Sequence, residues 1–252
     1  MKIAMFGTTL YAGVISSLLA ESGHQVFICN DLQDHTALFN LRDQDVVRSL
    51  EKQHKSGFLS YCDFAALPLD IDAYFFSFNP AQEGEALGVA KQLKMRTIIH
   101  PKLMINASTF GLNGTEKLKA VLTDDHWVYF PDIIQEGQAF KSVTSASKVI
   151  IGCADQQAQG HLEEMLRPIF PRPQQYLFMP VLDAEFTKLS ISGMLATRIS
   201  YMNDLADVAE KLGIDIAHVR DGMAADSRIG ESYLYSGAGF GGENFSHDIL
   251  TL

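Results

Sequence analysis

The first thirty residues constrain the fold more than any other part of the chain. A short apolar run over residues 2–6 ends at Gly7, and an apolar pattern with helical spacing then continues to a stop at Gly23. The stretch HQVFICN, residues 24–30, follows as a second strand with the polar Asn30 at its end. Strand, glycine-containing turn, helix and strand in this order predict the opening βαβ unit of a dinucleotide-binding fold.

Strand-like runs continue to alternate with helical stretches up to about residue 180. The runs are AYFFSF (73–78), RTIIH (96–100), KLMINAS (102–108), HWVYF (126–130) and KVIIGC (148–153). Helical patterns such as GEALGVAKQLK (84–94) and QQAQGHLEEMLRPIF (156–170) separate them. This alternation predicts an α/β fold over residues 1–180, a Rossmann-like, doubly wound and largely parallel sheet covered on both faces.

The pattern of apolar residues changes after residue 180. From Asp183 to Leu212, apolar residues keep helical spacing and no glycine or proline cluster interrupts them, which predicts one helix of about eight turns. Asp183 is the expected N-cap, Gly213 the expected end, and Asp215 the expected cap of a second helix. Residues 181–252 should therefore form a long helix and a short helical C-terminal region that ends in the loop GFGGENFSHD.

Composition excludes several kinds of partner. The formal net charge of −10 disfavours nucleic acid and anionic membranes, and no apolar run reaches the length of about 20 residues that a membrane span needs. The three cysteines, Cys29, Cys62 and Cys153, are odd in number and widely spaced, so neither a disulfide framework nor a zinc site is expected. They are interpreted as buried thiols in a reducing compartment, and the chain as a cytoplasmic protein.

Six stretches share motifs with one known family. They are MKIAMFGTTLYAG (1–13), INAST (105–109), FPDIIQEGQA (130–139), AEFTKLSISGMLATRISYMNDLADVAEKLG (184–213), DSRIG (226–230) and GAGFGGENFSHD (237–248). Together they resemble the UDP-glucose/GDP-mannose dehydrogenase family, whose last three motifs read approximately AELxKYAxNAFLATRISFxNE, DxRIG and GxGFGGSCFPKD. The resemblance implies NAD in the N-terminal domain, a dimer formed through the long helix, and a nucleotide sugar held between that domain and a C-terminal one. Because the chain stops at Leu252, that C-terminal domain is expected to be absent.

The cofactor half departs from the family pattern at three positions. Thr9 stands at the second glycine of the GxGxxG turn, where a branched side chain would crowd the pyrophosphate, and Ala12 stands at the third. Asn30 stands where an acid would accept both ribose hydroxyls, a change that costs about 1 kcal/mol or five- to tenfold in affinity. NAD is therefore expected to bind weakly or not at all, and a tight turn without a ligand stays an alternative. The expected cofactor-binding residues are Gly7, Thr8, Thr9, Leu10, Tyr11, Asn30, Asp31, Ser108 and Thr109.

The catalytic half has lost its nucleophile. Oxidation of a sugar alcohol to a carboxylate uses a thiolate to hold the intermediate aldehyde, and the family's cysteine aligns with Asn244, whose amide cannot do so. Ser246 is two residues away without an obvious base, and His247 replaces the family's loop lysine. The expected catalytic positions are Thr109, Glu136, Lys188, Asn244 and Asp248. The expected substrate-binding residues are Lys188, Ser192, Arg228, Phe240 and Gly241, and no metal site is expected.

Three interpretations of function remain open. The leading one is a pseudoenzyme with an impaired NAD site that acts in binding or regulation, as a homodimer through the Asp183–Leu212 helix or as a heterodimer with an intact paralogue. The alternative is an NAD-dependent oxidoreductase that acts on the CH-OH group of a nucleotide sugar and stops after one hydride transfer. The third is a fragment whose remaining domain lies elsewhere.

Overall fold

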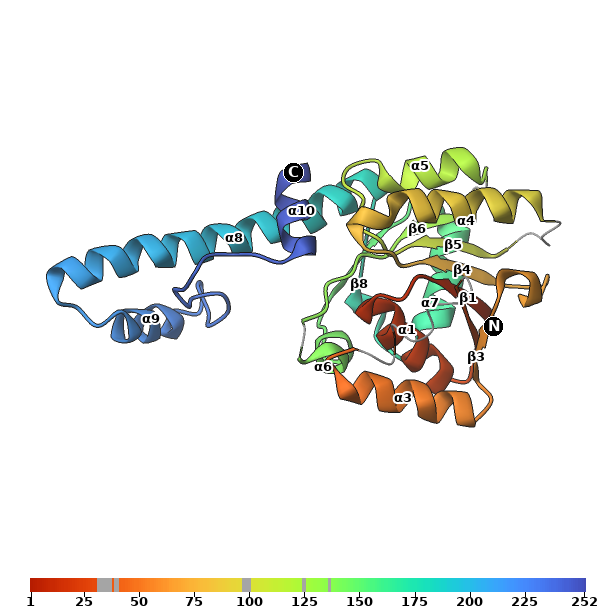
Figure 1. Cartoon of the computed structure of the whole chain (residues 1–252), viewed down its shortest axis with the longest axis horizontal. Helices are drawn as coiled ribbons and strands as arrows, with labels where there is room; N and C mark the ends of the chain where they lie inside the picture. The colour runs from red at the N-terminus through yellow and green to blue at the C-terminus, as the bar shows by residue number, and fades with distance from the viewer. Residues whose placement is uncertain (31–37, 39–40, 97–100, 124–125, 136) are drawn as a thin grey trace. The chain divides into compact units, whose positions relative to one another are not determined.

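The computed structural model describes residues 1–30, 38, 41–96, 101–123, 126–135 and 137–252 of the 252-residue chain (Figure 1). The chain divides into two compact units, Met1–Glu185 and Phe186–Leu252. The strand expected at residues 96–100 falls mostly outside the described residues.

The first unit is built on one sheet with strand order β3-β2-β1-β4-β5-β6-β7-β8 among the described residues. Its strands are β1 (Lys2–Phe6), β2 (Gln25–Cys29), β3 (Leu59–Cys62), β4 (Ala73–Phe76), β5 (Leu103–Asn106), β6 (Trp127–Tyr129), β7 (Val149–Gly152) and β8 (Tyr176–Met179). Neighbouring strands are parallel except for β6 and β7, which pair antiparallel. The order reverses between β1 and β4, and in such sheets the carboxyl ends of the strands at this point form the ligand crevice.

Helices cover both faces of the sheet, as Figure 1 shows. They are α1 (Leu10–Glu21), α3 (Gln44–Lys55), α4 (Glu83–Met95), α5 (Gly114–Val121), α6 (Ala139–Thr144) and α7 (Gln156–Leu166), with short 3-10 helices at Phe64–Ala66, Pro80–Gln82 and Pro173–Gln175. One hydrophobic cluster joins the sheet to α1, α3, α6 and α7, and a second joins it to α4 and α5. The prediction of a doubly wound, largely parallel α/β fold is confirmed.

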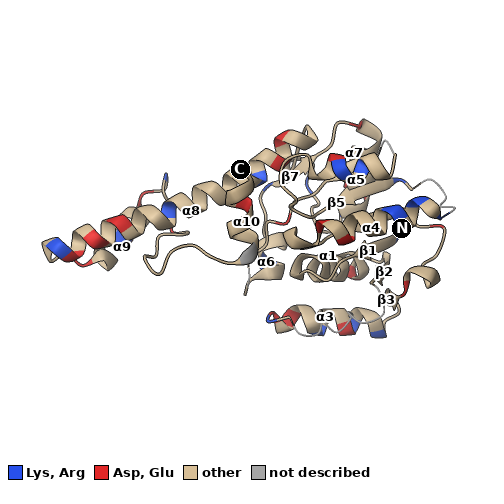
Figure 2. Cartoon of the chain, turned by 45° about the horizontal axis from the view of Figure 1, so that its top comes forward, with Lys and Arg blue, Asp and Glu red and all other residues tan. Residues whose placement is uncertain are grey.

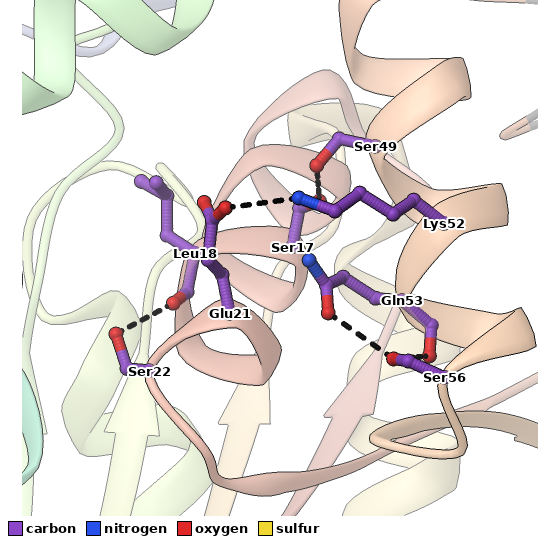
Figure 3. Close-up of polar contacts among 8 residues, drawn as sticks. All are labelled: Ser17, Leu18, Glu21, Ser22, Ser49, Lys52, Gln53 and Ser56. Atoms are coloured by element: carbon purple, nitrogen blue, oxygen red, sulfur yellow. Dashed lines mark hydrogen bonds and ion pairs between the residues drawn. The ribbon is translucent and has the colours of Figure 1, made fainter.

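Helices α1 and α3 pack closely because α1 lacks a side chain at the contact. A Cβ on Gly13 would lie 3.1 Å from Cγ1 of Val46. Polar contacts extend the same interface (Figure 3): Ser17 Oγ donates to Ser49 Oγ at 2.5 Å, and Lys52 Nζ lies 3.3 Å from Glu21 Oε1. These contacts hold the helix that follows the βα turn.

The second unit is helical. Helix α8 (Val181–Leu212) begins in the first unit and is followed by α9 (Ile216–Ala225) and α10 (Glu243–Thr251). Gly213 ends α8 with φ +69°, and the Asp215 carboxylate caps α9 by accepting from Ala217 N at 2.8 Å, so both of these expectations are confirmed.

Two details of the second unit differ from the sequence-based expectation. Helix α8 begins at Val181, so Asp183 lies in its first turn and is not its N-cap. The stretch GFGGENFSHD is a loop only up to Gly242, because α10 begins at Glu243. Pro180 ends the preceding segment and tolerates a helix start directly after it, which explains the earlier beginning. None of the described helices combines the length and apolar character that a bilayer crossing needs.

The cysteines differ in exposure. Cys29 and Cys153 are buried, but Cys62 is only half-buried, so the expectation of three buried thiols is wrong for Cys62. It ends β3, which is the edge strand of the sheet among the described residues.

His24 should make stability depend on pH. Its Nδ1 lies 3.1 Å from the Met1 ammonium and its Nε2 3.1 Å from Met165 O. Burial, and next the ammonium, lower the pKa of His24 from 6.5. The unfolded state therefore binds more protons, so the contribution is complete above the unfolded pKa and is lost as the pH falls through the folded pKa. We expect His24→Asn to lose less stability than the wild type between about pH 7 and about pH 5, measured as urea midpoints. Parallel losses in the two proteins would contradict this assignment.

Candidate functional site

The turn between β1 and α1 requires glycine at its first position. Gly7 has φ +98°, and a Cβ there would lie 1.8 Å from the carbonyl oxygen of Ser77 at the end of β4. Its amide donates to Asn30 Oδ1 at 3.0 Å, just after β2. Gly7 therefore ties together the ends of three neighbouring strands at the point where the strand order reverses.

Thr9 is the N-cap of α1. Its Oγ1 accepts from Ala12 N at 3.0 Å and lies 2.6 Å from Ser77 Oγ. A helix N-terminus attracts anions through its first amides, which have no partner inside the helix. The hydroxyl of Thr9 therefore occupies one of the amide groups that a phosphate would otherwise use.

Asn30 presents a donor at the end of β2. Its Oδ1 accepts from the Gly7 amide, so its Nδ2 must point the other way, and this atom is buried without a hydrogen-bond partner among the described residues. Asn30 lines a cavity of about 280 Å³ between the ends of β1 and β2 and helix α4. The polar residues of that lining are Thr8, Asn30, Gln82, Glu85 and Gln92.

Two of the expected cofactor residues have side chains engaged inside the first unit. Ser108 is buried, and its Oγ donates to Phe76 O at 3.0 Å and accepts from Phe78 N at 2.9 Å. Tyr11 packs its ring 5.9 Å from that of Phe130, and burial raises its pKa well above the ordinary value, with the Asp132 carboxylate adding to the effect. Their side chains support the turn and the strand ends.

The remaining expected residues of the first unit are more open or lie outside the described part. Thr8, Leu10 and Thr109 are half-buried around the same strand ends. Asp31 and Glu136 lie outside the described residues. Of these residues, Thr8 lines the cavity. The roles expected for Asp31 and Glu136 stay predictions.

In the second unit, three of the expected residues form one cluster. Asp248 on α10 is 2% exposed, and its Oδ2 lies 3.2 Å from Lys188 Nζ and accepts from Ser192 Oγ at 2.7 Å. Lys188 and Ser192 are four residues apart on α8 and so share one face of the helix. Asp248 Oδ1 and His247 Nδ1 are buried without a hydrogen-bond partner among the described residues. The cluster is thus a buried ion pair in which the second carboxylate oxygen, Asp248 Oδ1, has no hydrogen-bond partner within the described part of the chain.

Other expected residues of the second unit lie at its surface. Asn244 is exposed in the first turn of α10. The Arg228 side chain is 87% exposed and pairs with Asp226 at 2.6 Å. Phe240 is 41% exposed with its ring 5.9 Å from that of Phe245, and Gly241 is exposed. Within this unit, the structure joins Lys188, Ser192 and Asp248 and leaves the loop residues open.

Sequence reasoning missed Glu185. It is 2% exposed, and its carboxylate accepts from Asn113 N at 2.7 Å and from Thr115 N at 2.8 Å at the start of α5. A carboxylate at this end of a helix satisfies amides that have no partner inside it. The signal was present, because Glu185 lies three residues before Lys188 in the motif shared with the family.

Comparisons with known proteins all find UDP-glucose/GDP-mannose dehydrogenases. Residues 182–252 match the central-domain model of the UDP-glucose/GDP-mannose dehydrogenase family. The UDP-glucose 6-dehydrogenase of Pseudomonas aeruginosa is 38% identical over 275 residues, covering 100% of this chain and 60% of that protein. The UDP-glucose 6-dehydrogenase YwqF of Bacillus subtilis is 28% identical, covering 100% of this chain and 61% of that protein. The chain thus spans about three fifths of the length of these curated relatives.

Solved structures agree at the level of the fold. A UDP-glucose dehydrogenase from Pyrobaculum islandicum superposes with a TM-score of 0.86 at 22% identity, covering 99% of this chain and 62% of that one. A GDP-mannose dehydrogenase from Pseudomonas aeruginosa gives 0.78 at 19% identity, covering 99% and 63%. The chain is therefore similar along its whole length to UDP-glucose 6-dehydrogenases, and its residues 182–252 match the central domain of the UDP-glucose/GDP-mannose dehydrogenase family.

Proposed function

We propose that this protein is a dehydrogenase relative that cannot complete a four-electron oxidation and that works through binding, to a nucleotide sugar or to another protein chain. The observation that carries the proposal is Asn244, which stands at the family's cysteine position in the first turn of α10. A carboxamide nitrogen is not nucleophilic enough to capture an aldehyde, so the second hydride has no covalent intermediate from which to leave.

The ligand is best identified by a binding screen. NAD, NADP, UDP-glucose, UDP-glucuronate and GDP-mannose are tested against the purified chain by thermal shift. A ligand that binds only the folded form stabilises it by about 2.7 kcal/mol when present at about a hundredfold excess over its Kd. A nucleotide sugar that shifts the melting temperature, with little shift from NAD, supports a binding protein. Strong shifts from NAD and a sugar nucleotide together would contradict it.

Weak NAD binding is part of the proposal, and Thr9 and Asn30 support it. The Thr9 hydroxyl caps α1 by accepting from Ala12 N, and Asn30, which lines the cavity, carries a buried N–H where a carboxylate would offer a second acceptor. A ribose hydroxyl can still accept from that N–H, but it loses a charged acceptor. A Kd for NAD of about ten micromolar or tighter would contradict this part of the proposal.

Asn30→Asp should restore part of the affinity for NAD. The new carboxylate can keep one oxygen on the Gly7 amide and offers a second, charged acceptor in place of the Asn30 N–H, so the Kd is expected to fall by about five- to tenfold in calorimetric titration. Asn203→Asp is the matched control, because Asn203 Oδ1 likewise accepts from a glycine amide, Gly237 N at 2.8 Å, in the other unit. An equal gain in both variants would show that the added charge alone is responsible.

Self-association through α8 is the second part of the proposal. Positions 191, 194, 198, 201, 205, 208 and 212 follow the alternating spacing of three and four residues that lets one helix pack along another. Met194, Tyr201 and Val208 are 64%, 54% and 50% exposed. Arg198 is the single charged residue between Leu189 and Asn203, and Figure 2 shows this stretch of α8 almost without charge. A second copy of the chain supplies the matching row.

Charges placed in this row should separate the copies. We expect the wild type to have the mass of a dimer in light scattering at micromolar concentration. The double variant Tyr201→Glu/Val208→Glu should have the mass of a monomer, because a dimer would have to bury the new carboxylates of both copies in the interface without partners. Ser200→Glu is the control, since residue 200 is exposed and lies outside the row. A monomeric wild type, or a double variant that still forms dimers, would refute self-association through α8.

A second candidate function is oxidation that stops at the aldehyde. The cluster of Lys188, Ser192 and Asp248 supports it, because a one-step oxidation needs no cysteine. Production of NADH from a nucleotide sugar by the wild type, lost in Asp248→Asn, would favour this function. The Asn side chain keeps the shape and can still accept from Ser192.

A further inference from the structure

Two cysteines lie side by side where strands β2 and β3 end. Cys29 is the last residue of β2 and Cys62 the last of β3, and the two are partners in the parallel register. Neighbouring strands lie about 4.8 Å apart, within the Cα separations of about 4.4–6.8 Å that a disulfide spans. Paired residues on adjacent strands point to the same face of the sheet, so the two side chains share that face. No disulfide joins them in the structure.

The two sulfurs have different surroundings. A hydrogen bond from Cys29 lowers the pKa of Cys62, and the Arg96 guanidinium acts in the same direction, while burial and the Asp63 carboxylate oppose it. Arg96 is held in place by donating to Phe64 O at 2.7 Å and by lying over the Phe64 ring. Cys62 is half-buried, whereas Cys29 is 3% exposed. Cys62 is therefore the accessible and more reactive thiol, and Cys29 the internal one.

The pair borders the cavity described above. Cys29 and its neighbour Asn30 both line it, as does Phe64. Cys29 also belongs to the hydrophobic cluster that joins the sheet to α4, and the partly buried Cys62 packs against that cluster. A bond between them would lie in the cavity wall, next to the residue that anchors the Gly7 turn.

We propose that Cys29 and Cys62 are a site of reversible disulfide formation in the wall of this cavity, with glutathione disulfide as an oxidant. The Cys62 thiolate attacks one sulfur of glutathione disulfide, which forms a mixed disulfide and releases one glutathione thiolate. Cys29 gives up its proton and attacks the Cys62 sulfur, and the second glutathione leaves. The protein loses two electrons and two protons, and two molecules of reduced glutathione carry them. The site is independent of the proposed function, because it needs neither NAD nor a sugar.

The disulfide should be easy to reduce. Side chains on neighbouring parallel strands start about 4.8 Å apart, slightly more than the Cβ separation of about 3.5–4.5 Å that disulfides prefer. Closing the bond pulls the ends of two strands together, and strained disulfides are the labile ones. Excess reduced glutathione should therefore return both thiols.

The test treats the folded full chain with glutathione disulfide and follows intact mass and peptide maps. The wild type should lose two hydrogen atoms in mass and give one cross-linked peptide pair that contains Cys29 and Cys62. Cys153→Ser is the control and should behave like the wild type. Cys29→Ser should stop at the mixed disulfide, with one glutathione on Cys62. Cys62→Ser should react with glutathione disulfide more slowly than the wild type does.

Three outcomes would overturn the proposal, and all are read on the wild type. They are a glutathione that stays on Cys62 without transfer, a cross-link that includes Cys153, and no reaction before the protein unfolds. Failure of NAD or sugar binding leaves these readouts unchanged, so the test is separate from that of the proposed function.

Discussion

Gly7→Ala is expected to destabilise the first unit by about 2–5 kcal/mol. A Cβ at this position would lie 1.8 Å from the Ser77 carbonyl, and the φ of +98° is one that alanine rarely adopts. The backbone must therefore move at the point where β1, β2 and β4 meet. Trp127 is the single tryptophan of the chain and is buried in this unit, so its fluorescence during urea unfolding measures the effect.

Gly160→Ala is the matched control for this prediction. Gly160 lies inside α7, a Cβ there meets nothing within 4 Å, and its φ is not positive. Alanine should stabilise that helix by about 0.5–1 kcal/mol. Equal stability of Gly7→Ala and the wild type would show that the turn does not have the conformation described here.

Lys188→Met should destabilise the second unit by about 3–5 kcal/mol, because it leaves the buried Asp248 carboxylate without its charge partner. The Lys188 side chain is only 16% exposed and that of Asp248 3%, so water cannot replace the lost contact. Lys117→Met is the control, because the Lys117–Glu83 pair is exposed and should cost about 0–1 kcal/mol. Urea unfolding followed by circular dichroism measures both. Equal costs would mean that the pair between α8 and α10 is solvated.

The retained family residues also have a structural role. The contacts among Lys188, Ser192 and Asp248 join α10 to α8. A protein without chemistry would still need them to fold its C-terminal helix. Their presence is therefore compatible with a binding protein as well as with a one-step oxidation, and Asn244 argues only against the complete four-electron oxidation.

Much of the fold could be predicted from hydrophobic periodicity. The opening βαβ unit, the long helix and its end at Gly213 all follow from strong local patterns. Strands β3 and β8 and helix α3 were not predicted. LSYC is short and mixed in polarity, and YLFM follows a proline-rich segment. QDVVRSLEKQHK carries only three apolar residues, and although Val46, Val47 and Leu50 keep helical spacing, this short amphipathic pattern was overlooked. The antiparallel pairing of β6 and β7 is a matter of tertiary contact that local patterns do not encode.

The sequence could predict which residues belong to the candidate site, but not how their side chains contact one another. Family motifs identified Lys188, Ser192 and Asp248, but only the packing of α10 on α8 shows that one carboxylate oxygen serves both partners. Thr9 was expected to crowd a phosphate, and its role as the cap of α1 depends on backbone geometry. Glu185 was missed because a buried acid resembles a surface acid in a helical sequence.

The most direct test of the central claim measures product and stoichiometry together. Purified protein is incubated with NAD and UDP-glucose or GDP-mannose, NADH is followed by absorbance, and the sugar nucleotide is identified by mass spectrometry. With a carboxamide at residue 244, no uronic acid should form, and any reduced cofactor should match an aldehyde one to one. Accumulation of the uronic acid with two molecules of NADH per sugar would contradict the account.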